Sequence, residues 1–124
     1  MSESKGNVQT ATQLVEVTPK PVHKTETYTW TVELFERQGK CWLGWSTNAP
    51  FRAQQGQIRF YADSFPSNPE ERIVAWTWDD DVTWPNPFNT GKPWGSGWCA
   101  AWVAQKKPNG PYVYFVKTPV TTEG

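Results

Sequence analysis

The residues whose types could carry chemistry are concentrated between Ala75 and Trp102. This stretch combines an acidic triplet, Asp79 to Asp81, with six of the nine tryptophans of the chain: Trp76, Trp78, Trp84, Trp94, Trp98 and Trp102. An indole offers a flat apolar face that stacks on the C–H face of a sugar ring. Carboxylates and amides beside it can bond to the sugar hydroxyls. The combination therefore indicates a non-enzymatic, lectin-like domain that binds a glycan.

The middle of this stretch, Asp79 to Gly97, is rich in Pro, Asn and Gly and is predicted to be a long loop. Loops run over the surface because a buried one would leave backbone polar groups unpaired. Trp84 and Trp94 are therefore expected to be at least partly exposed, and exposed aromatic surface usually marks a binding site. The predicted ligand-binding residues are Trp84, Trp94, Asp80, Asp81, Asn89 and, in second place, Trp78.

The same residues give little support for catalysis. His23 is the only histidine, and it lies in the polar segment that precedes the first long predicted strand. A catalytic base must instead be held rigidly beside its nucleophile. A glycosidase with paired carboxylates needs a defined separation between them, which no spacing here fixes. We therefore expect no enzymatic activity.

A metal or cofactor is not expected either. Asp79 to Asp81, helped by Asn86 and Asn89, could offer oxygen ligands to calcium, but the triplet lacks the spacing of an EF-hand loop. A solvated strand end is the simpler interpretation, and calcium stays an alternative. Cys41 and Cys99, each beside a tryptophan, could be two buried thiols or a disulfide worth roughly 4 kcal/mol by the loop-entropy model. Both readings stay open.

Composition limits the class of partner. The 124 residues include 12 Lys and Arg against 12 Asp and Glu, so the clustered positive charge that nucleic acid requires is missing. No apolar run is long enough for a membrane span. The first residues lack a signal-peptide pattern, and both a secreted and a cytoplasmic location stay open. In its short length and many tryptophans the chain is similar to small lectins and carbohydrate-binding modules. No motif of those families matches it, so none of their binding residues can be assigned to positions in this sequence.

The scaffold that must present the tryptophans is predicted to be all-β, a single-domain antiparallel sandwich or small barrel of six to seven strands. Residues 1–24 are expected to be flexible, with Gln13 to Val17 as a short edge strand, and residues 25–124 to form the domain. Arg72 to Trp78 has two apolar faces, which favours a central strand. The other predicted strands are Tyr28 to Arg37 and Lys40 to Ser46, joined by a turn at Gln38-Gly39, then Gly56 to Asp63, Gly97 to Gln105 and Pro111 to Thr118.

Three other interpretations of the tryptophans compete with glycan binding. They could simply fill the core, which suits Trp30, Trp45, Trp98 and Trp102 because each lies in a predicted strand. An indole loop also suits a lipid interface, as in a membrane-active, cytolysin-like protein. An aromatic patch could equally form a subunit interface in a structural or assembly protein that makes a homo-oligomer.

Overall fold

The computed structural model describes residues 8–17, 26–49, 53–79, 87–107 and 109–122. Within these ranges the chain forms strands, turns and loops, with no helix of the kind that could span a membrane. The strands are β1 (Val8–Val17), β2 (Glu26–Arg37), β3 (Lys40–Thr47), β4 (Gln54–Ala62), β5 (Ala75–Trp78), β6 (Phe88–Pro93), β7 (Trp98–Gln105) and β8 (Tyr112–Lys117).

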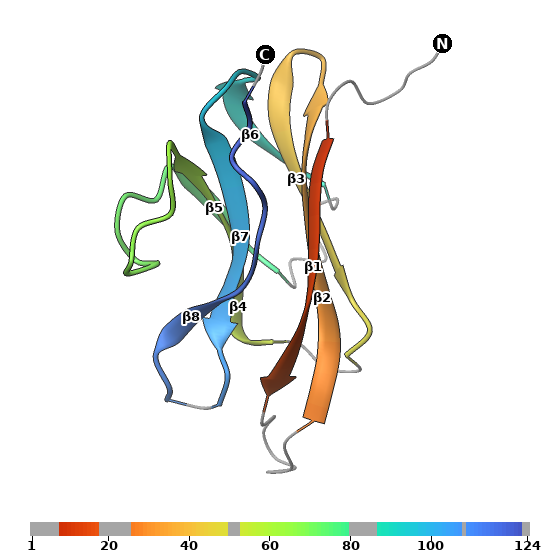
Figure 1. The fold of residues 1–124 in the computed structure, drawn as a ribbon, viewed down its shortest axis with the longest axis vertical. Coiled ribbons are helices and arrows are strands. Elements are labelled where there is room, and N and C mark those ends of the chain that lie inside the picture. The colour runs from red at the N-terminus through yellow and green to blue at the C-terminus, as the bar shows by residue number, and fades with distance from the viewer. Residues whose placement is uncertain (1–7, 18–25, 50–52, 80–86, 108, 123–124) are drawn as a thin grey trace.

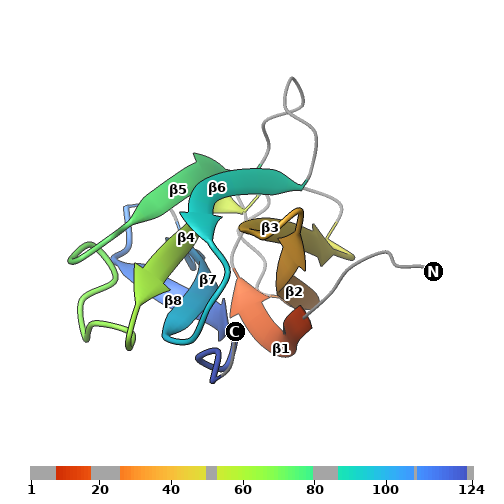
Figure 2. The same cartoon turned by 90° about the horizontal axis from the view of Figure 1, so that it is seen from above.

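The eight strands form two antiparallel sheets that face each other (Figures 1 and 2). Strand order is β1-β2-β3-β6 in the first sheet and β5-β4-β7-β8 in the second. The all-β prediction is confirmed, and of its two architectures the strands described adopt the sandwich-like one. The predicted number of strands is wrong, because β6 lies within the stretch that is predicted to be a long loop.

The hairpin of β2 and β3 forms where the sequence predicts it. Arg37 pairs with Lys40, and the two residues between them, Gln38 and Gly39, both have positive φ, at 54° and 77°. Two consecutive residues of positive φ are the mark of a type I′ turn, whose twist matches that of the flanking strands. The hairpin thereby fixes which side chains of β2 face the second sheet.

Strand β1 is longer than the predicted Gln13 to Val17. It pairs with β2 along its whole length, from Val8 opposite Phe35 to Val17 opposite Glu26. Residues 8–17, expected to belong to a flexible segment, thus form the outer strand of the first sheet. The predicted start of the domain at residue 25 stays a prediction, since residues 1–7 and 18–25 lie outside the described ranges.

Strand β5 lies at the edge of the second sheet, so the prediction that it is central is wrong. The central positions belong to β4 and β7. On β7 both faces are buried, as its alternating Trp, Ala and Cys suggest. On β5 one face is buried and the other, which carries Trp76 and Trp78, faces outward. In this chain, a strand with two apolar faces is therefore either a central strand buried on both sides, as β7 is, or an edge strand with one exposed aromatic face, as β5 is.

The core between the sheets is built from aromatic rings. Trp30 of β2 is fully buried and meets Trp102 of β7 and Phe115 of β8 edge to face, with ring centroids 5.0 Å apart in each pair. Phe60 stacks on Trp98 with centroids 4.8 Å apart. Such pairs add about 0.5–1.5 kcal/mol each beyond the burial of their area. The contacts of Trp30 join the two sheets, whereas Phe60 and Trp98 pack against each other within the second sheet.

Candidate functional site

Two tryptophans of β5 form the largest exposed aromatic surface among the described residues. Trp76 is 44% exposed and Trp78 is 38% exposed. Their ring centroids are 5.3 Å apart and the ring planes stand at 87°. The two indoles therefore contact each other edge to face and form a preformed, partly exposed aromatic pair.

The pleat of β5 explains why these two rings share one side. Alternate residues of a strand point to opposite faces, so Ala75 and Thr77 turn inward while Trp76 and Trp78 turn outward. Trp76 lies opposite Arg59 of β4, and Trp78 lies opposite Gln57. The indoles thus border a polar pair on the same outer face of the second sheet.

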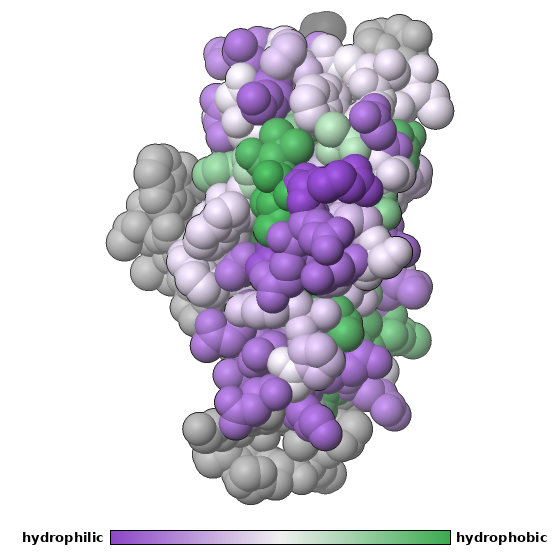
Figure 3. All heavy atoms as spheres, turned by 90° about the vertical axis from the view of Figure 1, so that its left-hand side faces the viewer, coloured by the Kyte–Doolittle hydropathy of each residue, from purple (hydrophilic) through white to green (hydrophobic). Residues whose placement is uncertain are grey.

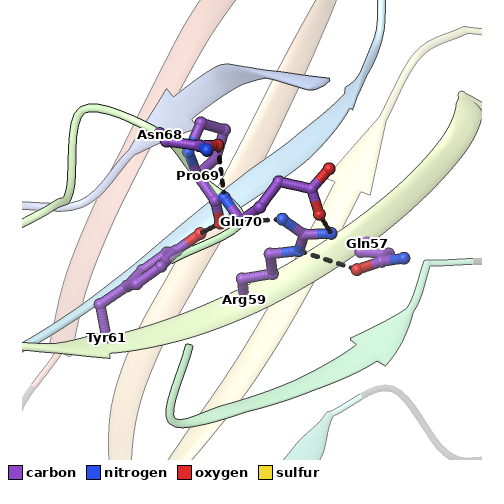
Figure 4. Close-up of polar contacts among 6 residues, drawn as sticks. All are labelled: Gln57, Arg59, Tyr61, Asn68, Pro69 and Glu70. Atoms are coloured by element: carbon purple, nitrogen blue, oxygen red, sulfur yellow. Dashed lines mark hydrogen bonds and ion pairs between the residues drawn. The ribbon is translucent and has the colours of Figure 1, made fainter. Parts of the chain in front are cut away.

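Arg59 is the centre of that polar group (Figure 4). Its Nε donates to Gln57 Oε1 at 2.8 Å, and its Nη1 donates to the carbonyl of Pro69 at 2.8 Å. Its Nη2 lies 3.6 Å from a carboxylate oxygen of Glu70. The guanidinium also lies over the ring of Tyr112, 5.0 Å from the centroid. Four partners therefore hold one buried cation in a single position.

Glu70 is the part of this group that solvent can reach. Its side chain is 51% exposed, whereas that of Arg59 is 4% exposed. Arg59 lies opposite Trp76 in the β4–β5 ladder, so the Glu70 carboxylate is anchored on the same outer face of the second sheet as the indole pair. A carboxylate fixed by a buried cation can accept hydrogen bonds from hydroxyl groups without first losing much side-chain entropy.

The loop that carries Glu70 covers the rest of this face; we call residues 63–74 the cover loop. Tyr61 donates its hydroxyl to the carbonyl of Pro69 at 2.6 Å, and Tyr114 donates to that of Pro66. Burial raises the pKa of Tyr61 well above its ordinary value, so its hydroxyl stays a donor. Figure 3 faces the side on which β5 lies in Figure 1, and it shows a compact apolar group within a mainly hydrophilic surface.

The first aspartate of the acidic triplet has a structural role. Its Oδ2 accepts a hydrogen bond from Trp102 Nε1 at 3.0 Å, and its backbone carbonyl accepts one from Trp45 Nε1 at 2.9 Å. Asp79 therefore joins a tryptophan of each sheet. The carboxylate fits beside Gly56, where a Cβ atom would come within 1.8 Å of Oδ2. The adjoining bulge in β4, which includes Gln55 at φ 55°, shapes this space.

The other predicted site residues do not come together. Trp94 is partly buried against the core, and its backbone N–H donates to Gly39, so it belongs in part to the scaffold. Asn89 is exposed on β6, in the first sheet, and its Oδ1 accepts a hydrogen bond from the N–H of Gly91. Trp78 lies on the outer face of the second sheet. Trp84, Asp80 and Asp81 lie outside the described residues, and their role in binding stays a prediction.

Sequence reasoning missed two residues of this surface. Trp76 lies two residues before Trp78 and therefore on the same face of the strand, a pattern that identifies it, although two apolar faces favour a central strand instead. No sequence pattern around Glu70 identifies it as a site residue. Its position depends on its ion pair with Arg59, which is eleven residues earlier in the chain (70 − 59 = 11).

The cysteines are free thiols on different sides of their sheets. Cys41 is packed in the core between the sheets, and Cys99 faces outward from β7 beneath the cover loop. The disulfide is therefore not the arrangement observed. Among the described residues no group of three or more His, Cys, Asp or Glu side chains could hold a metal ion. Calcium binding by the triplet stays untested.

Comparison with known proteins gives no relative for this chain: no protein-family model, curated protein or solved structure matches it.

Proposed function

We propose that the chain is a non-enzymatic glycan-binding domain, and that the Trp76–Trp78 face of β5 is its contact surface. The observation that carries this proposal is a pair of exposed indoles on an outer sheet face that also carries a carboxylate paired with a buried guanidinium. A sugar ring needs both kinds of surface at once. Its C–H face stacks on the indole, and its hydroxyl groups donate to the carboxylate.

The polar group beside the indoles favours a sugar over a lipid surface. Seating this outer face of the second sheet on a bilayer would bring the half-exposed Glu70 carboxylate toward a medium that cannot solvate its charge, which is costly even for a paired carboxylate. A sugar would instead replace the water around Glu70 with hydroxyl groups. The face shown in Figure 3 is also mainly hydrophilic, which suits a water-soluble ligand.

An array of immobilised saccharides tests the proposal. The wild-type chain should bind a subset of them, and Trp76→Ala and Trp78→Ala should each weaken that binding by about tenfold or more, as expected for aromatic hot spots. Glu70→Gln keeps the shape of the side chain but removes its charge. It should weaken binding several-fold, because charge-assisted hydrogen bonds are roughly twice as strong as neutral ones.

Leu14→Ala is the matched control, since Leu14 is 69% exposed and lies on β1 in the other sheet. It should leave saccharide binding unchanged. Equal binding by the wild type and both tryptophan variants would refute the assignment of this face. Binding to lipid vesicles, or dimerisation that Trp76→Ala abolishes, in the absence of any saccharide binding, would refute the glycan proposal in favour of a membrane or subunit surface.

A further inference from the structure

A hollow lies on the opposite side of the sandwich from the Trp76–Trp78 face, on the outer face of the first sheet. It has a volume of about 480 Å³, within the range of roughly 300–1,000 Å³ that is usual for ligand pockets. The residues that line it come from three neighbouring strands and from the position before β6: Thr10, Thr31, Glu33, Phe35, Arg37, Gly44, Trp45, Ser46 and Pro87. It shares no residue with the Trp76–Trp78 face.

The strand register explains why the face is hollowed at this point. Glu33 of β2 has Thr10 of β1 on one side and Gly44 of β3 on the other. Gly44 has no side chain and Thr10 has a short one, so little side-chain volume fills the outer face on either side of the Glu33 carboxylate. A glycine inside a strand often marks a place where another molecule approaches the backbone closely.

One end of the hollow is closed by a cation between aromatic rings. The guanidinium of Arg37 lies 5.3 Å from the ring centroid of Phe35 and 4.8 Å from that of Trp42. Trp42 Nε1 also donates to the backbone carbonyl of Arg37 at 3.2 Å. Phe35 is 2% exposed although it points away from the core, because its neighbours on this face cover it. The Arg37 guanidinium is therefore held in position at this end of the hollow by the rings around it.

The lining defines the class of ligand. Among the described residues it carries one carboxylate, on Glu33, and one guanidinium, on Arg37, so their formal charges cancel and favour neither an anion nor a cation. The hydroxyl groups of Thr10, Thr31 and Ser46 also line it and can both donate and accept hydrogen bonds. From Thr31 to Arg37 the strand advances six residues (37 − 31 = 6), or about 20 Å. That length suits a short chain of sugars better than a single one.

We propose that this hollow binds a neutral oligosaccharide, with Glu33 and the hydroxyl side chains as its hydrogen-bonding partners. The proposal goes beyond the β5 surface and does not require that surface to bind. If both sites bind, one chain has two glycan sites on opposite faces of the sandwich and can cross-link glycans without forming an oligomer.

The test uses the full chain with Trp76→Ala and Trp78→Ala combined, so that the β5 surface is disabled. On an array of neutral and acidic saccharides this background should retain binding to neutral oligosaccharides. Adding Glu33→Gln, which preserves shape, or Ser46→Tyr, which fills the hollow from an exposed position, should weaken that binding by about tenfold or more. Adding Glu16→Gln, on the same outer face but away from the hollow, should not change it.

The outcomes separate the two sites. Loss of all saccharide binding in the Trp76→Ala, Trp78→Ala background overturns the second site and leaves the β5 proposal standing. Retained neutral binding that Glu33→Gln removes supports the second site, even if the two tryptophan substitutions have no effect of their own. Retained binding that neither Glu33→Gln nor Ser46→Tyr alters overturns it. A wild-type chain that binds no saccharide overturns both proposals.

Discussion

Replacing Asp79 should destabilise the fold even though it belongs to an acidic triplet next to a predicted binding loop. In Asp79→Ala the indole N–H of Trp102, which is only 2% exposed, loses the carboxylate oxygen that it reaches at 3.0 Å. A hydrogen bond to a charged group is worth about 1.5–3 kcal/mol, and a buried donor left without a partner costs a similar amount. We therefore expect the free energy of unfolding to fall by about 2–3 kcal/mol.

Two further substitutions give this prediction its internal checks. Asp79→Asn keeps an acceptor oxygen and should cost only about 1 kcal/mol. Gly56→Ala places a methyl group 1.8 Å from Asp79 Oδ2, so the carboxylate must leave Trp102 and the cost should again be about 2–3 kcal/mol. In Asp79→Ala the obstructing carboxylate is absent, so the double variant should be more stable than the sum of the single losses predicts, by on the order of 2 kcal/mol.

Urea denaturation followed by far-UV circular dichroism measures these differences without relying on tryptophan emission, which the substitutions alter. Glu71→Ala, at an exposed carboxylate of the cover loop, is the control and should stay within about 0.5 kcal/mol of the wild type. The reasoning is refuted if Asp79→Ala also stays within that range. It is refuted as well if the losses from Gly56→Ala and Asp79→Ala simply add.

Two other predictions follow from burial. Trp76→Ala should change the free energy of unfolding by less than about 1 kcal/mol, whereas Trp30→Ala should cost about 3–5 kcal/mol, and a reversed order in urea denaturation would contradict the placement of both rings. Burial also raises the thiol pKa of Cys41 to about 12 and that of Cys99 to about 11, from 9.0. Because the unfolded chain ionises these thiols first, stability that is present below pH 9 should decline as the pH rises toward 11 or 12. If a double variant that combines Cys41→Ala and Cys99→Ala loses as much stability over this pH range as the wild type does, the thiols are excluded as the cause.

The elements that sequence reasoning found are those whose signals are local. The β2–β3 hairpin combines a clean alternation with a Gln38-Gly39 turn, and both features act within a dozen residues. Strand β6 could not be found in this way, because Phe88 to Pro93 has no alternation and contains both Gly and Pro. It is a strand only because β3 is beside it, with Leu43 opposite Phe88 and Trp42 opposite Asn89.

The candidate site was predictable only in its chemistry. The abundance of tryptophan and carboxylate pointed to a surface that suits sugars, and Trp78 is on the face that the structure exposes. Which tryptophans lie outside depends on sheet order, and Trp94 packs on the core because β6 directs the chain back across the sandwich. The partnership of Arg59 and Glu70 depends on the fold of the cover loop, which residue spacing does not specify.

The cover loop also divides the molecule into parts that can open separately. The sulfur of Cys99 lies under it, in a small cluster with Phe65 and Ile73, while Cys41 is packed between the two sheets. We expect that lifting the loop breaks its hydrogen bonds to Arg59, Tyr61 and Tyr114 and exposes Cys99 while the sandwich stays closed. Exposing Cys41 requires the sheets to separate, at a free energy near that of complete unfolding. The two thiols are therefore natural markers for motions of different size, with Cys99 recording local opening and Cys41 recording global opening.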